Sequence, residues 1–238
     1  DLCSGKPLNK IKNLLYKKNG KIIVNPMRDF IDLNKEDKPI WDIINLEPYI
    51  KRHKFGPKKN KRALGISVGR GCIFNCSYCV NNALGKKWRA LSAKEIIKRI
   101  KFLQKNYDIQ HFTIVDDCFD VDMKRVEEFC NTLLKEGIKI TWEVNVRTGK
   151  KWTDERMELL VKSGCILLCV GAESGSDRVL KNIFHKGITT EDILYIAKQC
   201  RKHKMLVAMG WMSGIPNETE EDMNKTIDLI KKVVKICP

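Results

Sequence analysis

Three cysteines close together are the feature of this sequence best suited to chemistry. Cys72, Cys76 and Cys79 lie in the stretch GRGCIFNCSYCV, residues 69–80, with the spacing C-x3-C-x2-C. Thiolates bind zinc and iron–sulfur clusters, but a structural zinc site needs a fourth Cys or His, and the next such residue is His111. Three thiolates can hold a [4Fe–4S] cluster and leave one iron open to another ligand. The spacing therefore favours a cluster, with zinc and purely structural cysteines as alternatives.

Length and composition limit the setting of this motif. A chain of 238 residues can bury one sizeable core, so we expect one main domain with an appendage. Ten cysteines without a secretory signal predict a reducing compartment, the cytoplasm, and favour metal binding over disulfides. No apolar run is long enough for a membrane span. Because the first residue is Asp1, we expect the natural chain to begin upstream.

The charge is strongly basic, with 45 Lys and Arg against 29 Asp and Glu and a net charge of +16. A basic protein can bind nucleic acid, and one dense patch, KRHKFGPKKNKR at residues 51–62, keeps that class open. The patch contains Gly and Pro and reads as an exposed loop. Because lysines are spread over the whole chain, a solvated surface is the favoured interpretation, and nucleic acid is not a favoured partner.

A repeating pattern of strands and helices must position the cysteines. Short apolar runs predict strands at residues 64–69, 111–116, 139–146, 165–172 and 205–213. The segments between them have helical periodicity, and their predicted first residues are Ser92, Asp120 or Asp122, Thr153, Ser176, Thr189 and Asn217. This alternation predicts an α/β fold, a partial (βα)6-type parallel barrel with about five strands present and its C-terminal part incomplete.

The first part of the chain does not follow this rhythm. Residues 14–25, LLYKKNGKIIVN, predict a hairpin whose turn is Asn19-Gly20. An extended connector would then lead into the barrel. The cysteines follow the first barrel strand, and active sites of parallel barrels gather at the carboxyl ends of the strands.

These motifs together resemble the radical S-adenosylmethionine (SAM) enzymes. The spacing C-x3-C-x2-C with an aromatic residue, Tyr78, before the third Cys is the family's motif. VGAESGSDRVLKNIFHKGITTEDI and MGWMSGIPNETEED resemble its fourth-strand and fifth-strand regions, while VDDCFD and WEVNVR fit its second and third strands. The resemblance covers roughly residues 63–238, the predicted radical SAM core.

The resemblance implies cofactors and a reaction. Cys72, Cys76 and Cys79 would hold a [4Fe–4S] cluster, and SAM would chelate the open iron through its amino and carboxylate groups. An electron donor such as flavodoxin or ferredoxin would reduce the cluster. Cleavage of SAM would then produce a 5′-deoxyadenosyl radical that takes a hydrogen atom from a substrate, an unidentified small molecule or peptide. The cofactors perform the hard chemistry, and the protein orients and shields them.

The resemblance also implies a set of SAM-binding residues. Tyr78 would lie beside the adenine. Asp116 or Asp117 would receive the SAM amino group, and Glu173 would contact the ribose hydroxyls or the ammonium. Arg147 would meet the SAM carboxylate or the substrate. The fifth-strand pattern of Gly210, Met212 and Gly214 would meet the adenine. Ordinary structural roles stay open for each: a helix cap or turn for the aspartates, ion pairs for Glu173 and Arg147, and core packing for Met212.

The N-terminal connector resembles the segment that follows a cobalamin-binding domain in B12-dependent radical SAM proteins. Residues 38–49, KPIWDIINLEPY, carry this likeness, although the chain contains no D-x-H-x-x-G corrinoid motif. We therefore expect residues 1–62 to be a connector after a cobalamin domain that is not in this chain. The implied function is cobalamin-dependent methyl transfer to an unactivated carbon. Alternatives are a radical SAM enzyme for cyclisation, oxidation or RNA methylthiolation, and a non-enzymatic iron–sulfur or zinc protein that binds nucleic acid.

Overall fold

The computed structural model describes residues 1–35, 39, 41–52, 61–83 and 86–238. The chain forms two compact units, residues 1–36 and residues 37–238. The smaller unit contains a short helix η1 (Leu8–Lys10) and the antiparallel hairpin of β1 (Leu15–Lys18) and β2 (Lys21–Val24). Asn19 and Gly20 both have positive φ, 49° and 77°, as a type I′ turn requires. The predicted hairpin is confirmed.

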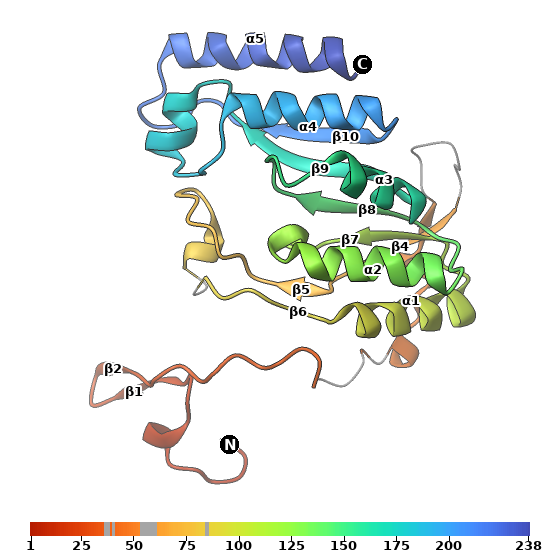
Figure 1. Ribbon diagram of the computed structural model, residues 1–238. Helices are drawn as coiled ribbons and strands as arrows, with labels where there is room; N and C mark the ends of the chain where they lie inside the picture. The colour runs from red at the N-terminus through yellow and green to blue at the C-terminus, as the bar shows by residue number, and fades with distance from the viewer. Residues whose placement is uncertain (36–38, 40, 53–60, 84–85) are drawn as a thin grey trace. The chain divides into compact units, whose positions relative to one another are not determined.

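The larger unit is built on a six-stranded sheet in the order β10-β9-β8-β7-β4-β3. Its strands are β3 (Lys51–Arg52), β4 (Arg62–Ile66), β7 (His111–Ile114), β8 (Thr141–Val146), β9 (Cys165–Glu173) and β10 (Leu206–Trp211). The strands from β4 to β10 are parallel, and β3 pairs antiparallel with β4. The sheet curls into a half-barrel (Figure 1), which confirms the predicted α/β fold and its five parallel strands.

Strand β3 and two short helices are among the features that the sequence did not predict. β3 lies at the start of the basic patch, which was predicted to be an exposed loop, and that prediction is wrong for these two residues. Helices η2 (Trp41–Ile43) and η3 (Glu47–Tyr49) lie in the segment that was expected to be an extended connector. Two residues are too few to show an alternating pattern, so only pairing with β4 reveals the strand. Most of the basic patch, residues 53–60, lies outside the described residues. The choice between a solvated surface, which the sequence favours, and nucleic-acid binding therefore stays untested.

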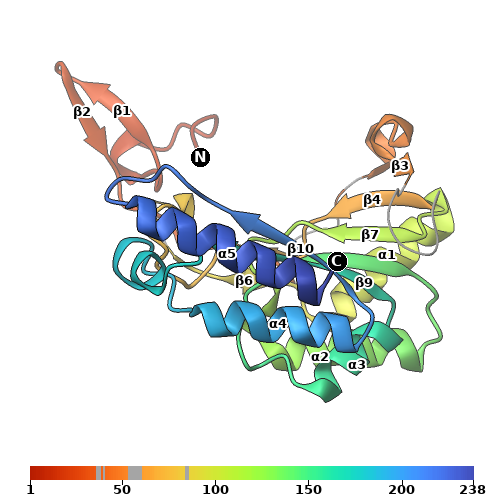
Figure 2. The ribbon, with the colours of Figure 1, turned by 90° about the horizontal axis from the view of Figure 1, so that it is seen from above.

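The helices cover one face of the sheet, as Figures 1 and 2 show. They are α1 (Ala93–Tyr107), α2 (Met123–Lys135), α3 (Asp154–Lys162), α4 (Thr190–Lys202) and α5 (Glu220–Ile236). Ser92 caps α1 by accepting the Glu95 N–H, and Asp122 caps α2, as predicted. Helix α5 begins after Thr219 rather than after Asn217, because Asn217 has a left-handed φ of 65°. Within the described residues, no helix is long and apolar enough to cross a membrane.

The core lies between the sheet and these helices. Along β8, Trp142 and Val144 point into the core, while Glu143 and Asn145 point to the opposite, concave face. Trp142 packs edge-on against Phe129 of α2, with ring centroids 5.3 Å apart. One face of the sheet is therefore devoted to stability, which leaves the concave face free for a site.

A buried carboxylate ties the last helix to the segment after β9. Asp222, in the first turn of α5, pairs with Arg178 and accepts a hydrogen bond of 2.5 Å from Ser176 Oγ. It also accepts the N–H and the hydroxyl of Thr219 in a capping box. Arg178 and Ser176 together hold the pKa of Asp222 far below its usual range.

Asp222→Asn is expected to lower the free energy of unfolding by about 2 kcal/mol at pH 7, because charged hydrogen bonds are lost. A lowered pKa stabilises the folded state above the ordinary Asp pKa of about 4, and this stabilisation disappears as the pH falls below it. The difference between variant and wild type should therefore shrink toward zero in acid. Urea unfolding at several pH values measures it. Asp228→Asn, on the exposed side of the same helix, is the control, and an equal loss there would refute the assignment.

Candidate active site

A cavity of about 560 Å³ lies at the carboxyl ends of the parallel strands. Its walls come from the cysteine loop and from the ends of β8, β9 and β10. Of the eleven residues predicted for the site, those that line it are Cys72, Cys76, Tyr78, Cys79, Asp117, Arg147, Glu173 and Gly210. Asp116, Met212 and Gly214 are not among its lining residues. The fold thus brings together residues that are up to 138 positions apart in the sequence, from Cys72 to Gly210.

All ten cysteines are free thiols, and the three of the motif face this cavity. Cys76 is buried, whereas Cys72 and Cys79 are half-buried. The neighbouring Cys118 thiol lowers the pKa of Cys72 to about 6, against the opposing effect of burial. A thiol with this pKa is mostly ionised at neutral pH, and the thiolate is the form that binds metals.

The cysteine loop is held at both ends. At its start, the two-stranded sheet of β5 (Gly69–Arg70) and β6 (Arg89–Ala90) closes its base. Gly71 has a φ of 80°, and a Cβ there would lie 2.2 Å from the Lys87 carbonyl oxygen, so only glycine fits without a shift. Further along, Ser77 donates its N–H to the Phe184 carbonyl and its hydroxyl to the Ile183 carbonyl. The thiols are therefore presented by a loop fixed to two separate parts of the barrel.

The two consecutive aspartates after β7 have different surroundings. Asp116 is buried and accepts the backbone N–H groups of Val68 and Gly69, both at 2.8 Å. Burial raises the pKa of Asp116, and these two N–H groups oppose the rise. Asp117 lines the cavity and accepts the Gly71 N–H at 2.9 Å. Asp117 is thus the better placed of the two for a ligand, while the binding role predicted for Asp116 stays untested.

Glu173, the last residue of β9, forms a small polar cluster at the cavity wall. Its Oε1 accepts hydrogen bonds from the Tyr78 hydroxyl and the Lys186 ammonium, both at 3.0 Å. Burial, then the charge of Glu173, raises the pKa of Tyr78, so the phenol stays protonated and donates. Lys186 also donates to the Tyr78 oxygen at 3.0 Å. This cluster joins the cysteine loop to the end of the fourth parallel strand.

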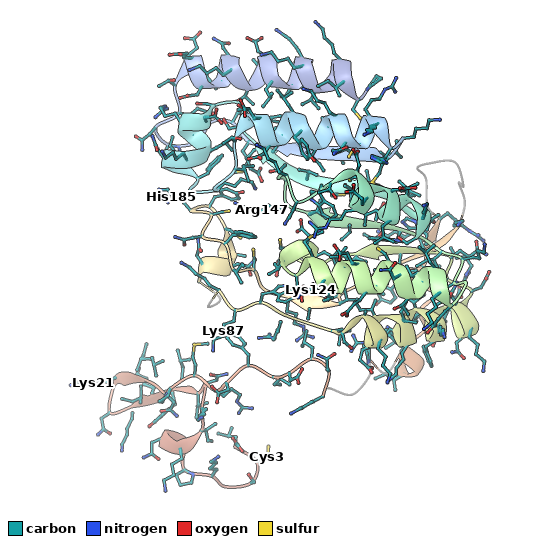
Figure 3. The ribbon with its side chains drawn as sticks, viewed as in Figure 1. Cys3, Lys21, Lys87, Lys124, Arg147 and His185 are labelled. Atoms are coloured by element: carbon teal, nitrogen blue, oxygen red, sulfur yellow. The ribbon has the colours of Figure 1, made fainter. Side chains whose placement is uncertain are left out.

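Arg147 lies beside one of the same thiols. Its guanidinium carbon is 3.9 Å from the ring centroid of Phe74, and its Nη1 is 3.6 Å from Cys76 Sγ. Figure 3 labels Arg147 and His185 near the end of the sheet where the cysteine loop lies. Arg147 is a cation, and Asp117 and Glu173 are anions, so groups of both charges line the cavity.

The residues predicted from the fifth strand separate into two groups. Gly210 lines the cavity, and a Cβ added there would meet no atom within 4 Å, so the wall beside it is open. The Met212 N–H bonds to the Glu173 carbonyl, and its side chain packs against the core under α4 and α5. The Gly214 N–H donates to Glu218 Oε2 at 2.6 Å. The adenine contacts predicted for Met212 and Gly214 remain untested.

Sequence reasoning missed several residues that line the cavity, among them Cys118, Asn145, Cys169 and Lys186. Asn145 and Cys169 lie on strands, where alternation assigns them to one of two faces but cannot say which face is open. Lys186 follows a single turn of π-helix, Val179–Ile183, and such turns are frequent at functional sites. The sequence signal that could have identified Lys186 was its position next to a glycine, in the stretch that resembles the family's fourth-strand region.

The donor set fits an iron–sulfur cluster with an open iron. Three thiols from one loop face a shared cavity, and thiolates are the usual protein ligands of such clusters. Within the described residues, no three His, Cys, Asp or Glu side chains are gathered around one ion-sized point. In a cubane each thiolate binds a different iron, so its ligands need not converge. The groups of both signs beside the thiols suit a zwitterion such as SAM.

A sequence comparison places this chain in a family. The sequence model of the radical SAM superfamily matches residues 66–230, more than half of the chain. The chain belongs to the radical SAM superfamily. The match contains the three cysteines and every other cavity residue named above, so the cavity lies inside the radical SAM core.

Two relatives of this chain have names that state different reactions. It is 30% identical over 240 residues to "Uncharacterized methyltransferase PH0819" of Pyrococcus horikoshii, covering 98% of this chain and 49% of that protein. It is 26% identical over 214 residues to an anaerobic magnesium-protoporphyrin IX monomethyl ester cyclase of Rubrivivax gelatinosus, covering 90% of this chain and 38% of that protein. The radical SAM chain thus spans half or less of each of these two relatives.

A solved structure shares the fold. The radical SAM methyltransferase TsrM from Kitasatospora setae, solved with cobalamin and a [4Fe–4S] cluster, matches 98% of this chain with a TM-score of 0.74. The match covers 46% of TsrM at 17% sequence identity. At this identity the likeness shows the fold, and it extends beyond the barrel to nearly the whole chain.

Proposed function

We propose that this chain is the catalytic core of a radical SAM enzyme that, in the complete protein, performs cobalamin-dependent methyl transfer to an unactivated carbon. The observation that carries the proposal is the shared cavity, where three cysteine thiols meet groups of both charges in a chain of the radical SAM superfamily. When bound, the [4Fe–4S] cluster and SAM supply a one-electron route to a carbon-centred radical. The residues of this chain bind, orient and shield those groups.

The cysteine loop would hold the cluster through Cys72, Cys76 and Cys79. The low pKa of Cys72 favours the thiolate needed for binding. Asp117 and Ser77 keep the loop in place through the Gly71 N–H and the Phe184 carbonyl. These contacts hold the loop through groups other than the three thiols.

The remaining cavity residues would bind SAM. Asp117 and Glu173 offer carboxylate oxygens to an ammonium and to ribose hydroxyls, and Arg147 offers N–H donors to a carboxylate. Tyr78 and the open wall at Gly210 would border the adenine. Opposite charges at separate points of one cavity orient a zwitterion, because reversing it would bring like charges together.

Methyl transfer rests on likeness to known proteins. PH0819 is named a methyltransferase, and TsrM is a methyltransferase solved with cobalamin. Residues 1–62 would then be a connector after a cobalamin-binding domain, and 63–238 the radical SAM core. Bound cobalamin would supply the methyl group. An external one-electron donor, a flavodoxin or ferredoxin, would be the partner that reduces the cluster.

Cyclisation is the second candidate, since the chain is also similar to an anaerobic ester cyclase. RNA methylthiolation and the other oxidative outcomes have less support in the described residues. A cyclase and a methyltransferase would share the cavity described above. They differ in what the complete protein consumes and releases.

The complete protein, with cobalamin, reductant and substrate, is expected to release 5′-deoxyadenosine, S-adenosylhomocysteine and methylated product in about equal amounts. One SAM would renew the methyl group on cobalt and a second would give the radical. Mass spectrometry of the reaction mixture counts the three products. Two results would reject methyl transfer in favour of cyclisation. One is the formation of 5′-deoxyadenosine without S-adenosylhomocysteine, and the other is a complete protein that binds no cobalamin.

A further inference from the structure

Lys186 is a buried cation in the cavity wall that the proposed SAM contacts do not use. Only 8% of its side chain is exposed, yet it lines the cavity. Its ammonium is 3.0 Å from Glu173 Oε1 and 3.0 Å from the Tyr78 oxygen. A buried ammonium is costly unless it is paired and hydrogen-bonded, and these two partners satisfy that requirement.

The backbone around this cluster is arranged to bring the three side chains together. Glu173 and His185 adopt left-handed φ angles of 65° and 49°, which are uncommon for residues other than glycine. A Cβ on Gly171 would lie 2.3 Å from Glu173 Oε1 and 2.9 Å from Lys186 Nζ. The carboxylate and the ammonium thus occupy the space that a side chain at position 171 would need. Unusual backbone angles of this kind persist only where the surrounding structure holds them, and they gather at functional sites.

The cluster fixes Tyr78, which lies between two proposed iron ligands, Cys76 and Cys79. The Tyr78 ring packs edge-on against Phe184, with centroids 4.8 Å apart, and its hydroxyl is held by Glu173 and Lys186. The residue before it, Ser77, donates hydrogen bonds to the carbonyls of Phe184 and Ile183, in the segment that follows β9. Figure 1 shows this segment, in cyan after β9, beside the yellow cysteine loop.

Both contacts on the Glu173 side chain fall on one oxygen. Tyr78 and Lys186 donate to Oε1, and Glu173 lines the cavity. Among the described residues, Oε2 makes no hydrogen bond or ion pair, which leaves it available to a donor on a ligand. A carboxylate oxygen is a strong hydrogen-bond acceptor.

We propose that Lys186 is a positioning residue for SAM. It holds Oε1 of Glu173 and the hydroxyl of Tyr78, and so presents Oε2 to a ligand hydroxyl or ammonium and keeps Tyr78 at the adenine side. This inference rests on the proposed function, because it assumes that the cavity binds SAM. Lys186 acts through Glu173 and Tyr78 rather than by touching the reacting atoms.

The test measures SAM binding to the anaerobically reconstituted complete protein by calorimetry, with no turnover required. Lys186→Met should keep the iron and sulfide content but weaken SAM binding about tenfold, the effect of one charged hydrogen bond. Lys181→Met is the matched control, since Lys181 is exposed on the same segment. In the Lys186→Met protein, the change that SAM causes in the electron paramagnetic resonance signal of the reduced cluster should need a higher SAM concentration.

A second variant separates positioning from simple stability. Tyr78→Phe removes only the hydroxyl and should itself weaken SAM binding about tenfold. If Lys186 acts through Tyr78, the double variant should lose far less than the product of the two single losses, roughly twentyfold rather than a hundredfold. Equal SAM binding by Tyr78→Phe and wild type, or by Lys186→Met and Lys181→Met, would overturn the inference, as would losses that multiply. Failure of the wild type to bind the cluster or SAM would instead overturn the proposed function.

Discussion

Cys76→Ala is expected to abolish the iron–sulfur cluster. Wild-type protein reconstituted without oxygen should hold about four iron and four sulfide per chain, because each of three thiolates binds one iron of a cubane. Cys76 is the most buried of the three thiols, so a thiol from solvent cannot readily replace it. Cys72→Ala and Cys79→Ala should behave alike. Iron and sulfide analysis with the visible absorption of the cluster measures the loss.

Cys169→Ala is the matched control for this prediction. Cys169 lines the same cavity and is half-buried like Cys72 and Cys79, but it lies on β9 outside the motif. Its replacement should leave the iron and sulfide content unchanged. Stoichiometric zinc without sulfide in the wild type would contradict the cluster, and so would full iron content in Cys76→Ala. Either result would return the three cysteines to the zinc or structural alternatives.

The second large effect is expected on SAM affinity. Glu173→Gln and Asp117→Asn should each weaken SAM binding by about 1.5 to 3 kcal/mol, or roughly tenfold to a hundredfold, because a charged hydrogen bond is lost. Both substitutions keep the shape of the side chain. Asn at position 117 still carries an oxygen that can accept the Gly71 N–H, so the cysteine loop should keep its cluster. Calorimetric titration of the reconstituted protein with SAM measures the change.

Glu128→Gln controls for the loss of a negative charge. Glu128 lies exposed on α2 and is not among the residues that line the cavity. It should bind SAM as the wild type does. If Glu173→Gln and Asp117→Asn both match this control, the proposed SAM contacts are wrong, although the fold and the cluster site would stand. A variant that loses iron as well as SAM affinity would show that its carboxylate supports the loop rather than the ligand.

Local signals in the sequence determined most of the fold. The Asn19-Gly20 turn, the Ser92 cap and the five apolar runs each depend on residues close together in the chain, and each appears in the structure. The spacing of the cysteines is equally local, because all three lie in one loop. Interactions of this kind are decided by backbone angles and side-chain periodicity, which a sequence displays directly.

Contacts between distant segments decided the details of the site. The sequence could not choose between Asp116 and Asp117, because neighbours in the chain look alike until one of them meets the Val68 and Gly69 N–H groups. It also gave no reason to connect Lys186 with Tyr78, which is 108 positions away. Such pairs form only when the curled sheet brings the ends of its strands together. A residue's role in this cavity therefore depends on which strand end lies next to it, and that is a property of the tertiary structure.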